Sequence, residues 1–127
     1  MTIEFNEFQK DTLDNFLGHQ MVEISENFVV SKLVITNNHK QPMGLVHGGI
    51  YSTLAETICS YGANFNSEST FVGVNNNTDF LSSATEGELL CTATLIKKGR
   101  SYQLWEARIT LDEVLLAVSK VRLSRIN

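Results

Sequence analysis

A single helical segment among strand-like segments constrains the fold of this chain most strongly. Apolar residues recur every four positions within Ile50–Phe65, which predicts one long amphipathic helix. A shorter amphipathic helix is expected over Phe5–Leu17, with Gly18 at its end. The strand candidates are Phe28–Thr36, Phe71–Asn75, Glu88–Ile96, Tyr102–Leu111 and Val114–Leu123. This order predicts an α+β fold in which the long helix covers one face of an antiparallel sheet.

Composition narrows the class of protein. The 127 residues fit a single domain over residues 1–127, and 43% hydrophobic with 19% charged residues is typical of a globular protein. A net charge of −4 argues against a nucleic-acid partner. The acidic N-terminus and the lack of an apolar run of about 18 residues predict no signal peptide, no membrane partner and a cytoplasmic location. Cys59 and Cys91 lack metal-ligand spacing, so we expect buried thiols and no metal.

The start of the long helix carries the residues that best suit chemistry. Gly48 and Gly49 stand where backbone N–H groups lack helical partners and the helix dipole favours negative charge. Glu56 follows about two turns into the helix and could act as a base or a nucleophile. These are the parts of an acyl-transfer or hydrolysis site.

Two interpretations of Glu56 stay open. It lies roughly opposite the apolar stripe, so it could be a solvated surface carboxylate. The same helix face carries Ser52, Thr53 and Ser60 but no Lys or Arg, so a partner subunit or a ligand could cover it instead. Glu56 lies about 12 Å along the helix axis from Gly48, which is too far for both to act on one atom within one helix. A site shared across a two-fold dimer interface would solve this geometry.

Other polar groups give weaker signals. His47 could be a helix cap or a catalytic group, and His19 and His39 show no partner by sequence spacing. The only basic cluster runs from Lys97 to Ser101. It is either a solvated hairpin turn or a turn that holds the phosphates of a nucleotide-type ligand.

The segment Gln41–Gly49, followed by Leu54–Thr57 and Ser60, resembles the signature of the hotdog-fold acyl-CoA thioesterases. It is closest to the Arthrobacter-type branch of the 4-hydroxybenzoyl-CoA thioesterase superfamily, and there to 1,4-dihydroxy-2-naphthoyl-CoA and enterobactin-pathway proofreading thioesterases. The resemblance runs from about Gly18 to the end and includes Gly99–Ser101. It implies a long central helix wrapped by an antiparallel sheet, and active sites at the interface of a homodimer that often pairs into a homotetramer. It also implies acyl-CoA as substrate and no separate cofactor.

The resemblance further implies roles for single positions. Glu56 would be the nucleophile or general base, the Gly48 N–H would polarise the thioester carbonyl, and Ser60 would help to position water. Gln41 and His47 would help to place the thioester. The residues expected along the CoA chain are Gly73, Phe80, Leu81, Ser82, Ser83, Lys97, Lys98, Gly99, Arg100, Ser101 and Tyr102.

Two stretches depart from the family pattern. Residues Leu81–Ser83 are neutral where basic or aromatic residues are common, which puts a phosphate contact there in doubt. The stretch Asn75–Asp79 is unusually polar for a strand, so the strand could end differently.

The expected activity is therefore hydrolysis of an acyl-CoA thioester. An aryl or medium-sized acyl group is favoured, because Phe71, Phe80 and Tyr61 could line an apolar pocket. A non-catalytic acyl-CoA-binding or sensing module on the same fold is the alternative, and it would not need Glu56. A hydratase ranks last, because His47 has no acid close in sequence.

Overall fold

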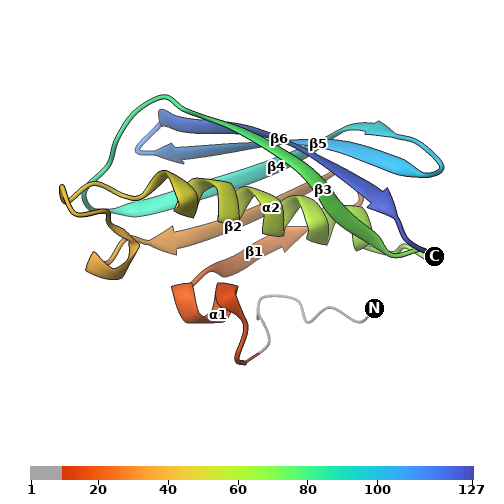
Figure 1. Cartoon of the computed structure of the whole chain (residues 1–127), viewed down its shortest axis with the longest axis horizontal. Coiled ribbons are helices and arrows are strands. Elements are labelled where there is room, and N and C mark those ends of the chain that lie inside the picture. Colours follow the sequence, from red (N-terminus) through yellow and green to blue (C-terminus); the bar gives the residue numbers. More distant parts are fainter. Residues whose placement is uncertain (1–9) are drawn as a thin grey trace.

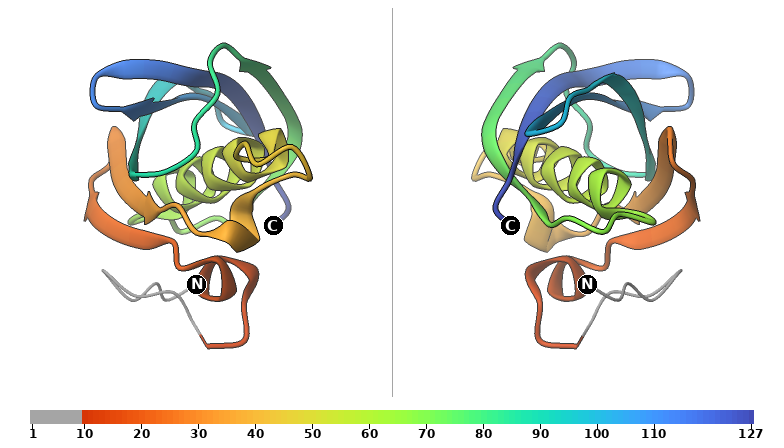
Figure 2. Two further views of the ribbon diagram at one scale, coloured as in Figure 1. Left: turned by 90° about the vertical axis from the view of Figure 1, so that its left-hand side faces the viewer. Right: turned by 90° about the vertical axis from the view of Figure 1, so that its right-hand side faces the viewer.

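The computed structural model describes residues 10–127 as an antiparallel sheet that curls around a long central helix (Figures 1 and 2). The strands are β1 (Gln20–Ile24), β2 (Phe28–Val34), β3 (Phe71–Phe80), β4 (Glu88–Lys98), β5 (Tyr102–Leu111) and β6 (Val114–Arg125). The helices are α1 (Leu13–Leu17), the 3-10 helix η1 (Asn37–His39) and α2 (Gly48–Asn64). The sheet order is β1-β2-β4-β5-β6-β3, and all neighbours are antiparallel. The predicted α+β arrangement is confirmed.

Most predicted elements agree with the structure within two residues at each end, but β1 is not among the expected strands. Its five residues, QMVEI, include two polar side chains, and its burial pattern shows little alternation. The strand exists because it pairs with β2, which follows after a short turn. Such an edge strand takes its stability from a neighbour, so its own sequence carries a weak signal.

The prediction that β3 ends at Asn75 is wrong, since the strand continues to Phe80. The polar side chains of this stretch find partners across the fold. Asn76 Nδ2 donates to the Ser52 carbonyl of α2 at 2.9 Å. The Thr78 hydroxyl lies 2.7 Å from the Ser119 hydroxyl of β6. Because these hydrogen bonds satisfy the inward polar groups, the strand can remain regular despite its composition.

α2 lies in the concave side of the sheet and carries the core (Figure 2). Leu54 and Ile58 are fully buried, as the four-residue periodicity predicts. At Gly62 a β-carbon would come within 2.4 Å of the Trp105 ring, so only glycine allows the helix to approach β5 this closely. The Trp105 indole N–H in turn donates to Gln103 Oε1 at 2.8 Å.

α1 covers the side of α2 that the sheet leaves open (Figures 1 and 2). Thr12 caps its first turn by accepting from the Asn15 N–H. Gly18 ends it in the left-handed conformation, with φ of 82°, as predicted. Within the described residues the helix begins at Leu13, and the part of the expected helix before residue 10 lies outside them.

The two edges of the sheet are β1 and β3. β3 pairs with β6 on one side, and no strand of residues 10–127 pairs with its other side. One face of α2 runs along β3, with Asn64 hydrogen-bonded to Phe71 at one end and Ser52 to Asn76 nearer the other. Glu56 therefore stands between the central helix and a free sheet edge. None of the helices in this part of the chain is long and apolar enough to cross a membrane.

Candidate active site

The first turn of α2 leaves one backbone donor without a partner. His47 is the N-cap residue, and its Nδ1 accepts from the Gly49 N–H at 2.9 Å. The Ile50 N–H donates to the His47 carbonyl at 2.9 Å. Within residues 10–127 the Gly48 N–H makes no hydrogen bond. It is thus available to a ligand at the positive end of a 17-residue helix.

His47 is held in place from both sides. Its backbone N–H donates to the His39 carbonyl at 2.9 Å, next to the bridge between Lys40 and Val46. Because Nδ1 accepts from an N–H, the proton of the neutral ring sits on Nε2. The side chain is exposed, so this second nitrogen can donate to a substrate. The cap and the ligand-binding interpretations of His47 are compatible.

A pocket of about 350 Å³ opens at this helix start. It is lined by Gln41, Leu45, Val46, Gly48, Tyr51, Phe80, Leu81, Ser82 and Ser83. The Phe80 ring lies over Gly48, where a β-carbon would come within 2.5 Å of it. Glycine at this position lets an aromatic ring and the free N–H share one wall of the pocket.

Gln41 shapes the loop that forms another wall. Its side-chain oxygen accepts from the Met43 N–H, and its backbone N–H donates to the Leu45 carbonyl at 2.8 Å. The structure therefore brings together Gln41, His47 and Gly48, as the sequence predicted. Phe80 to Ser83, expected along the CoA chain, line the same pocket.

Glu56 lies in a second pocket, of about 250 Å³, lined by Glu56, Gly73, Val74, Asn75, Asn76 and Val121. A β-carbon on Gly73 would be 3.7 Å from Glu56 Cγ, so glycine leaves room beside the carboxylate. The side chain is exposed, and it has no hydrogen bond or ion pair with any described residue. Ser60 follows one turn later, half-buried.

The basic turn lies at the far end of β3 from the first pocket. Lys97 and Lys98 end β4, and the Ser101 carbonyl accepts from the Arg125 N–H at 2.9 Å. Arg125 pairs with Phe71, the first residue of β3, whereas the pocket lies at the last. Within one chain, the basic turn and the Gly48 pocket are therefore apart.

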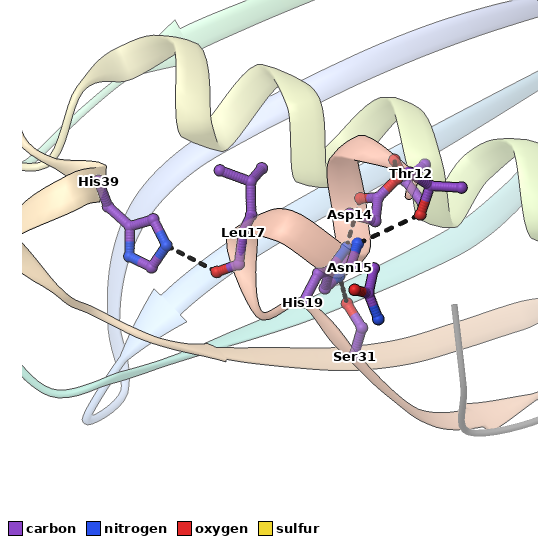
Figure 3. A network of polar contacts seen from close by, with 8 residues as sticks. Thr12, Asp14, Asn15, Leu17, His19, Ser31 and His39 are labelled. Carbon is purple, nitrogen blue, oxygen red and sulfur yellow. Dashed lines mark hydrogen bonds and ion pairs between the residues drawn. The ribbon is translucent and has the colours of Figure 1, made fainter. Parts of the chain in front are cut away.

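His19 and His39 do have partners, contrary to what sequence spacing suggested (Figure 3). His19 Nδ1 donates to Asp14 Oδ1 at 2.8 Å, and its Nε2 lies 2.7 Å from the Ser31 hydroxyl. His39 Nε2 donates to the Leu17 carbonyl at 2.7 Å. Thr57 Oγ1 donates to Asp14 Oδ2 at 2.9 Å, which joins α1 to α2.

The Asp14–His19–Ser31 network has the residue types of a hydrolytic triad, but it has no access for substrate. Ser31 is fully buried and the His19 side chain is 0% exposed. A nucleophile must be reached by the substrate, so this network serves to fasten α1 against α2 and β2. Residues 10–127 contain no group of three or more His, Cys, Asp and Glu side chains that could hold a metal ion.

Sequence reasoning missed Tyr51, which lines the Gly48 pocket. The residue is 2% exposed, and its ring centroid lies 6.2 Å from that of Phe80. Burial raises the pKa of its phenol. Its place one turn after the glycine pair was the available signal. Of the aromatic residues expected to line an acyl pocket, Phe80 does so, whereas Phe71 belongs to the core and Tyr61 is half-buried near Asp14.

Known proteins resemble this chain in sequence and fold. Residues 43–118 match the family model of the thioesterase superfamily. The structure of a Mycobacterium tuberculosis protein described as an esterase has a TM-score of 0.86 at 38% identity, covering 90% of this chain and 95% of that one. A 1,4-dihydroxy-2-naphthoyl-CoA hydrolase of Listeria monocytogenes is 33% identical over 111 residues, 85% of this chain and 90% of that protein. A Staphylococcus aureus thioesterase has a TM-score of 0.85 at 29% identity, covering 91% and 98%.

The family match spans more than half of the chain, and the structural matches span nearly all of it. The structural matches agree with the architecture of one helix inside a curled sheet. The chain belongs to the thioesterase superfamily and is a hotdog-fold thioester hydrolase.

Proposed function

We propose that this protein hydrolyses acyl-CoA thioesters with an aryl or medium-sized acyl group, at sites that two copies of the chain build together. The observation that carries the proposal is the position of two unsatisfied groups. The Gly48 N–H and the Glu56 carboxylate both lack partners within residues 10–127, and both lie beside the free edge strand β3. They are about 12 Å apart along one helix, so the two groups of a single chain cannot both reach the same thioester.

Antiparallel pairing of β3 with the β3 of a second copy would bring the two groups together. Glu56 lies beside Gly73 near the start of β3, and Gly48 lies beside Phe80 at its end. Two-fold pairing through the middle of the strand places the start of one β3 next to the end of the other. The Glu56 of one copy would then face the Gly48 N–H of its partner. The expected pairing of dimers into a homotetramer stays a prediction.

The same pairing would complete the site for CoA. The turn at Lys97 to Tyr102 lies by the start of β3 in its own chain. In the pair it would approach the end of the partner's β3, where Phe80 to Ser83 line the pocket. Lys97, Lys98 and Arg100 are exposed and can contact phosphates there. The neutral side chains of Ser82 and Ser83 would then need only to contact the pantetheine chain.

The chemistry needs one carboxylate and one donor. The thioester carbonyl accepts from the Gly48 N–H, which stabilises the oxyanion that forms when the carbon is attacked. As general base, Glu56 takes a proton from the attacking water, and the C–S bond then breaks to release CoA thiol and the acid. As nucleophile, Glu56 attacks the carbon itself, CoA leaves, and water hydrolyses the resulting anhydride. Ser60, one turn from Glu56, would help to position the water.

The lining of the Gly48 pocket supports the proposed acyl group. Leu45, Val46, Phe80 and Leu81 give it apolar walls suited to a ring or a medium chain. Structures exist of two variants of the Staphylococcus aureus relative. In one a glutamine is changed to alanine, and in the other a glutamate is changed to alanine. These positions are 15 residues apart in that protein, as Gln41 and Glu56 are here.

The test is the variant Glu56→Gln, which keeps the shape of the side chain and removes its charge. CoA release is followed with a thiol reagent on aryl, short-chain and long-chain acyl-CoA esters. We expect kcat to fall by roughly 100- to 10,000-fold on every ester, because loss of a general base or nucleophile has an effect of this size. Turnover at near wild-type level would refute the role of Glu56.

A further inference from the structure

Tyr51 carries a hydrogen-bonding group that the protein leaves unsatisfied. Its hydroxyl is the only buried side-chain oxygen or nitrogen within residues 10–127 that has no hydrogen-bond partner. A buried hydroxyl without a partner is costly, and phenylalanine would fill the same space without that cost. Such exceptions in a folded protein call for an explanation, and a ligand that supplies the missing partner is one.

The position of Tyr51 indicates where this ligand lies. The residue is on α2 three positions after Gly48, and helical side chains lean toward the N-terminus of their helix. Tyr51 and Gly48 line the same pocket of about 350 Å³, with the Phe80 ring tilted by 53° against the tyrosine ring. An acyl group whose thioester carbonyl reaches the Gly48 N–H would therefore share this pocket with Tyr51.

The surroundings of Tyr51 make it a donor rather than a charged group. Burial raises the pKa of its phenol, so the hydroxyl keeps its proton at neutral pH. Gln41, Ser82 and Ser83 line the same pocket and carry acceptor oxygens, but none of them is hydrogen-bonded to the Tyr51 hydroxyl. The missing partner is thus a hydrogen-bond acceptor that arrives with the ligand.

We propose that Tyr51 is a specificity-determining residue, whose hydroxyl donates to an oxygen substituent on the acyl group of the substrate. This inference rests on the proposed thioesterase function and adds a substrate preference to it. An acyl group that bears a hydroxyl or carbonyl oxygen accepts a hydrogen bond from the Tyr51 hydroxyl when it binds. Acyl groups without one leave it unpaired, which a site built for a hydrogen bond penalises strongly.

The test compares benzoyl-CoA with its 2-, 3- and 4-hydroxybenzoyl counterparts, using the full-length protein. Wild-type kcat/KM is expected to be at least about tenfold higher for one of the hydroxylated esters than for benzoyl-CoA. In Tyr51→Phe this ratio falls to about one, because the hydroxyl that distinguishes the esters is gone. Tyr61→Phe makes the same chemical change on the same helix outside the pocket, and it should leave the ratio unchanged.

Several outcomes overturn the inference. Equal losses on all esters would place Tyr51 at the thioester carbonyl instead. An unchanged ratio together with a lower Tm would mean that a buried water or a partner subunit holds the hydroxyl. If wild type hydrolyses none of the esters, the proposed function fails. In that case the Tyr51 inference is tested by binding alone. Calorimetry gives the Kd of each ester, and the ratio of Kd between benzoyl-CoA and the hydroxylated esters is compared in wild type and Tyr51→Phe.

Discussion

Two polar clusters lie along α2. They differ in whether a substrate can reach them and in whether their polar groups already have hydrogen-bond partners. The cluster of Asp14, His19 and Ser31 has the composition of a catalytic triad, yet its hydrogen bonds are made and its serine is fully buried (Figure 3). The cluster at the Gly48 pocket has a free N–H and an unpaired tyrosine hydroxyl. The first cluster uses its hydrogen bonds for stability, whereas the second keeps them for a ligand. Unmet hydrogen-bonding capacity in the lining of a pocket is therefore a better guide to the site than residue type.

This comparison predicts opposite effects on stability and activity. His19→Ala removes the partner that Asp14 and the fully buried Ser31 share, and Asp14 keeps only its bond from Thr57, so the free energy of unfolding should fall by about 2–4 kcal/mol. Glu56→Gln should change it by less than about 0.5 kcal/mol, because that side chain is exposed and unpaired. Urea denaturation followed by circular dichroism measures both.

The catalytic activity of a second variant in the buried network serves as the control for the His19 prediction. Ser31→Ala removes the oxygen that would be the nucleophile of a triad, and kcat should stay within about threefold of wild type for the folded fraction. A loss as large as that of Glu56→Gln would show that the buried network takes part in the chemistry, and the comparison would fail.

A smaller effect is expected at high pH, from the thiol beside the buried network. Burial raises the pKa of Cys91 from 9.0 to about 12, although a hydrogen bond from Ser31 works in the other direction. Above pH 9 the unfolded thiol ionises while the native one keeps its proton, so the unfolded state binds fewer protons and stability falls as pH rises. The stability that the protonated Cys91 thiol contributes is fully present below pH 9 and is lost between about pH 9 and 12.

The measurement compares unfolding free energies at pH 8 and pH 10. Wild type should lose about 1 to 1.5 kcal/mol more over this interval than Cys91→Ala, which has no thiol to ionise at that position. Cys59 is present in both proteins and cancels. An equal pH dependence in the two proteins would show that Cys91 ionises as easily in the fold as in the unfolded chain.

The sequence predicted the elements whose signals are local. The four-residue period of α2, the alternation of β4 to β6 and the glycine at the end of α1 all act within a few residues. The sequence also pointed to Gln41, His47, Gly48 and Glu56, and three of these four line or border one pocket. β1 was not predicted, because its pairing with β2, rather than its own side chains, makes it a strand.

The parts that the sequence did not reveal depend on contacts between distant segments. Ser31 lies 12 residues from His19, and Leu17 lies 22 residues from His39, so spacing alone could not pair them. The polar stretch of β3 continues because Asn76 reaches α2, 24 residues earlier. Tyr51 was not among the predicted site residues, because only the missing partner of its hydroxyl in the folded chain distinguishes it.

The central claim is that each site combines the Glu56 of one copy with the Gly48 N–H of another. Two variants test it directly when co-expressed with different tags and purified as mixed dimers. Glu56→Gln removes the carboxylate. Gly48→Pro removes the N–H at the first helical position, where the helix backbone accepts proline, and its ring also displaces the Phe80 side chain of the same site. Each variant alone should be inactive.

A mixed dimer contains one site with both changes and one site with neither, if the sites are shared. We therefore predict that CoA release by the mixed dimer reaches about half of the wild-type rate per dimer. If both groups act within one chain, every site of the mixed dimer carries one change. Activity no higher than that of the two parent variants would then contradict the shared site.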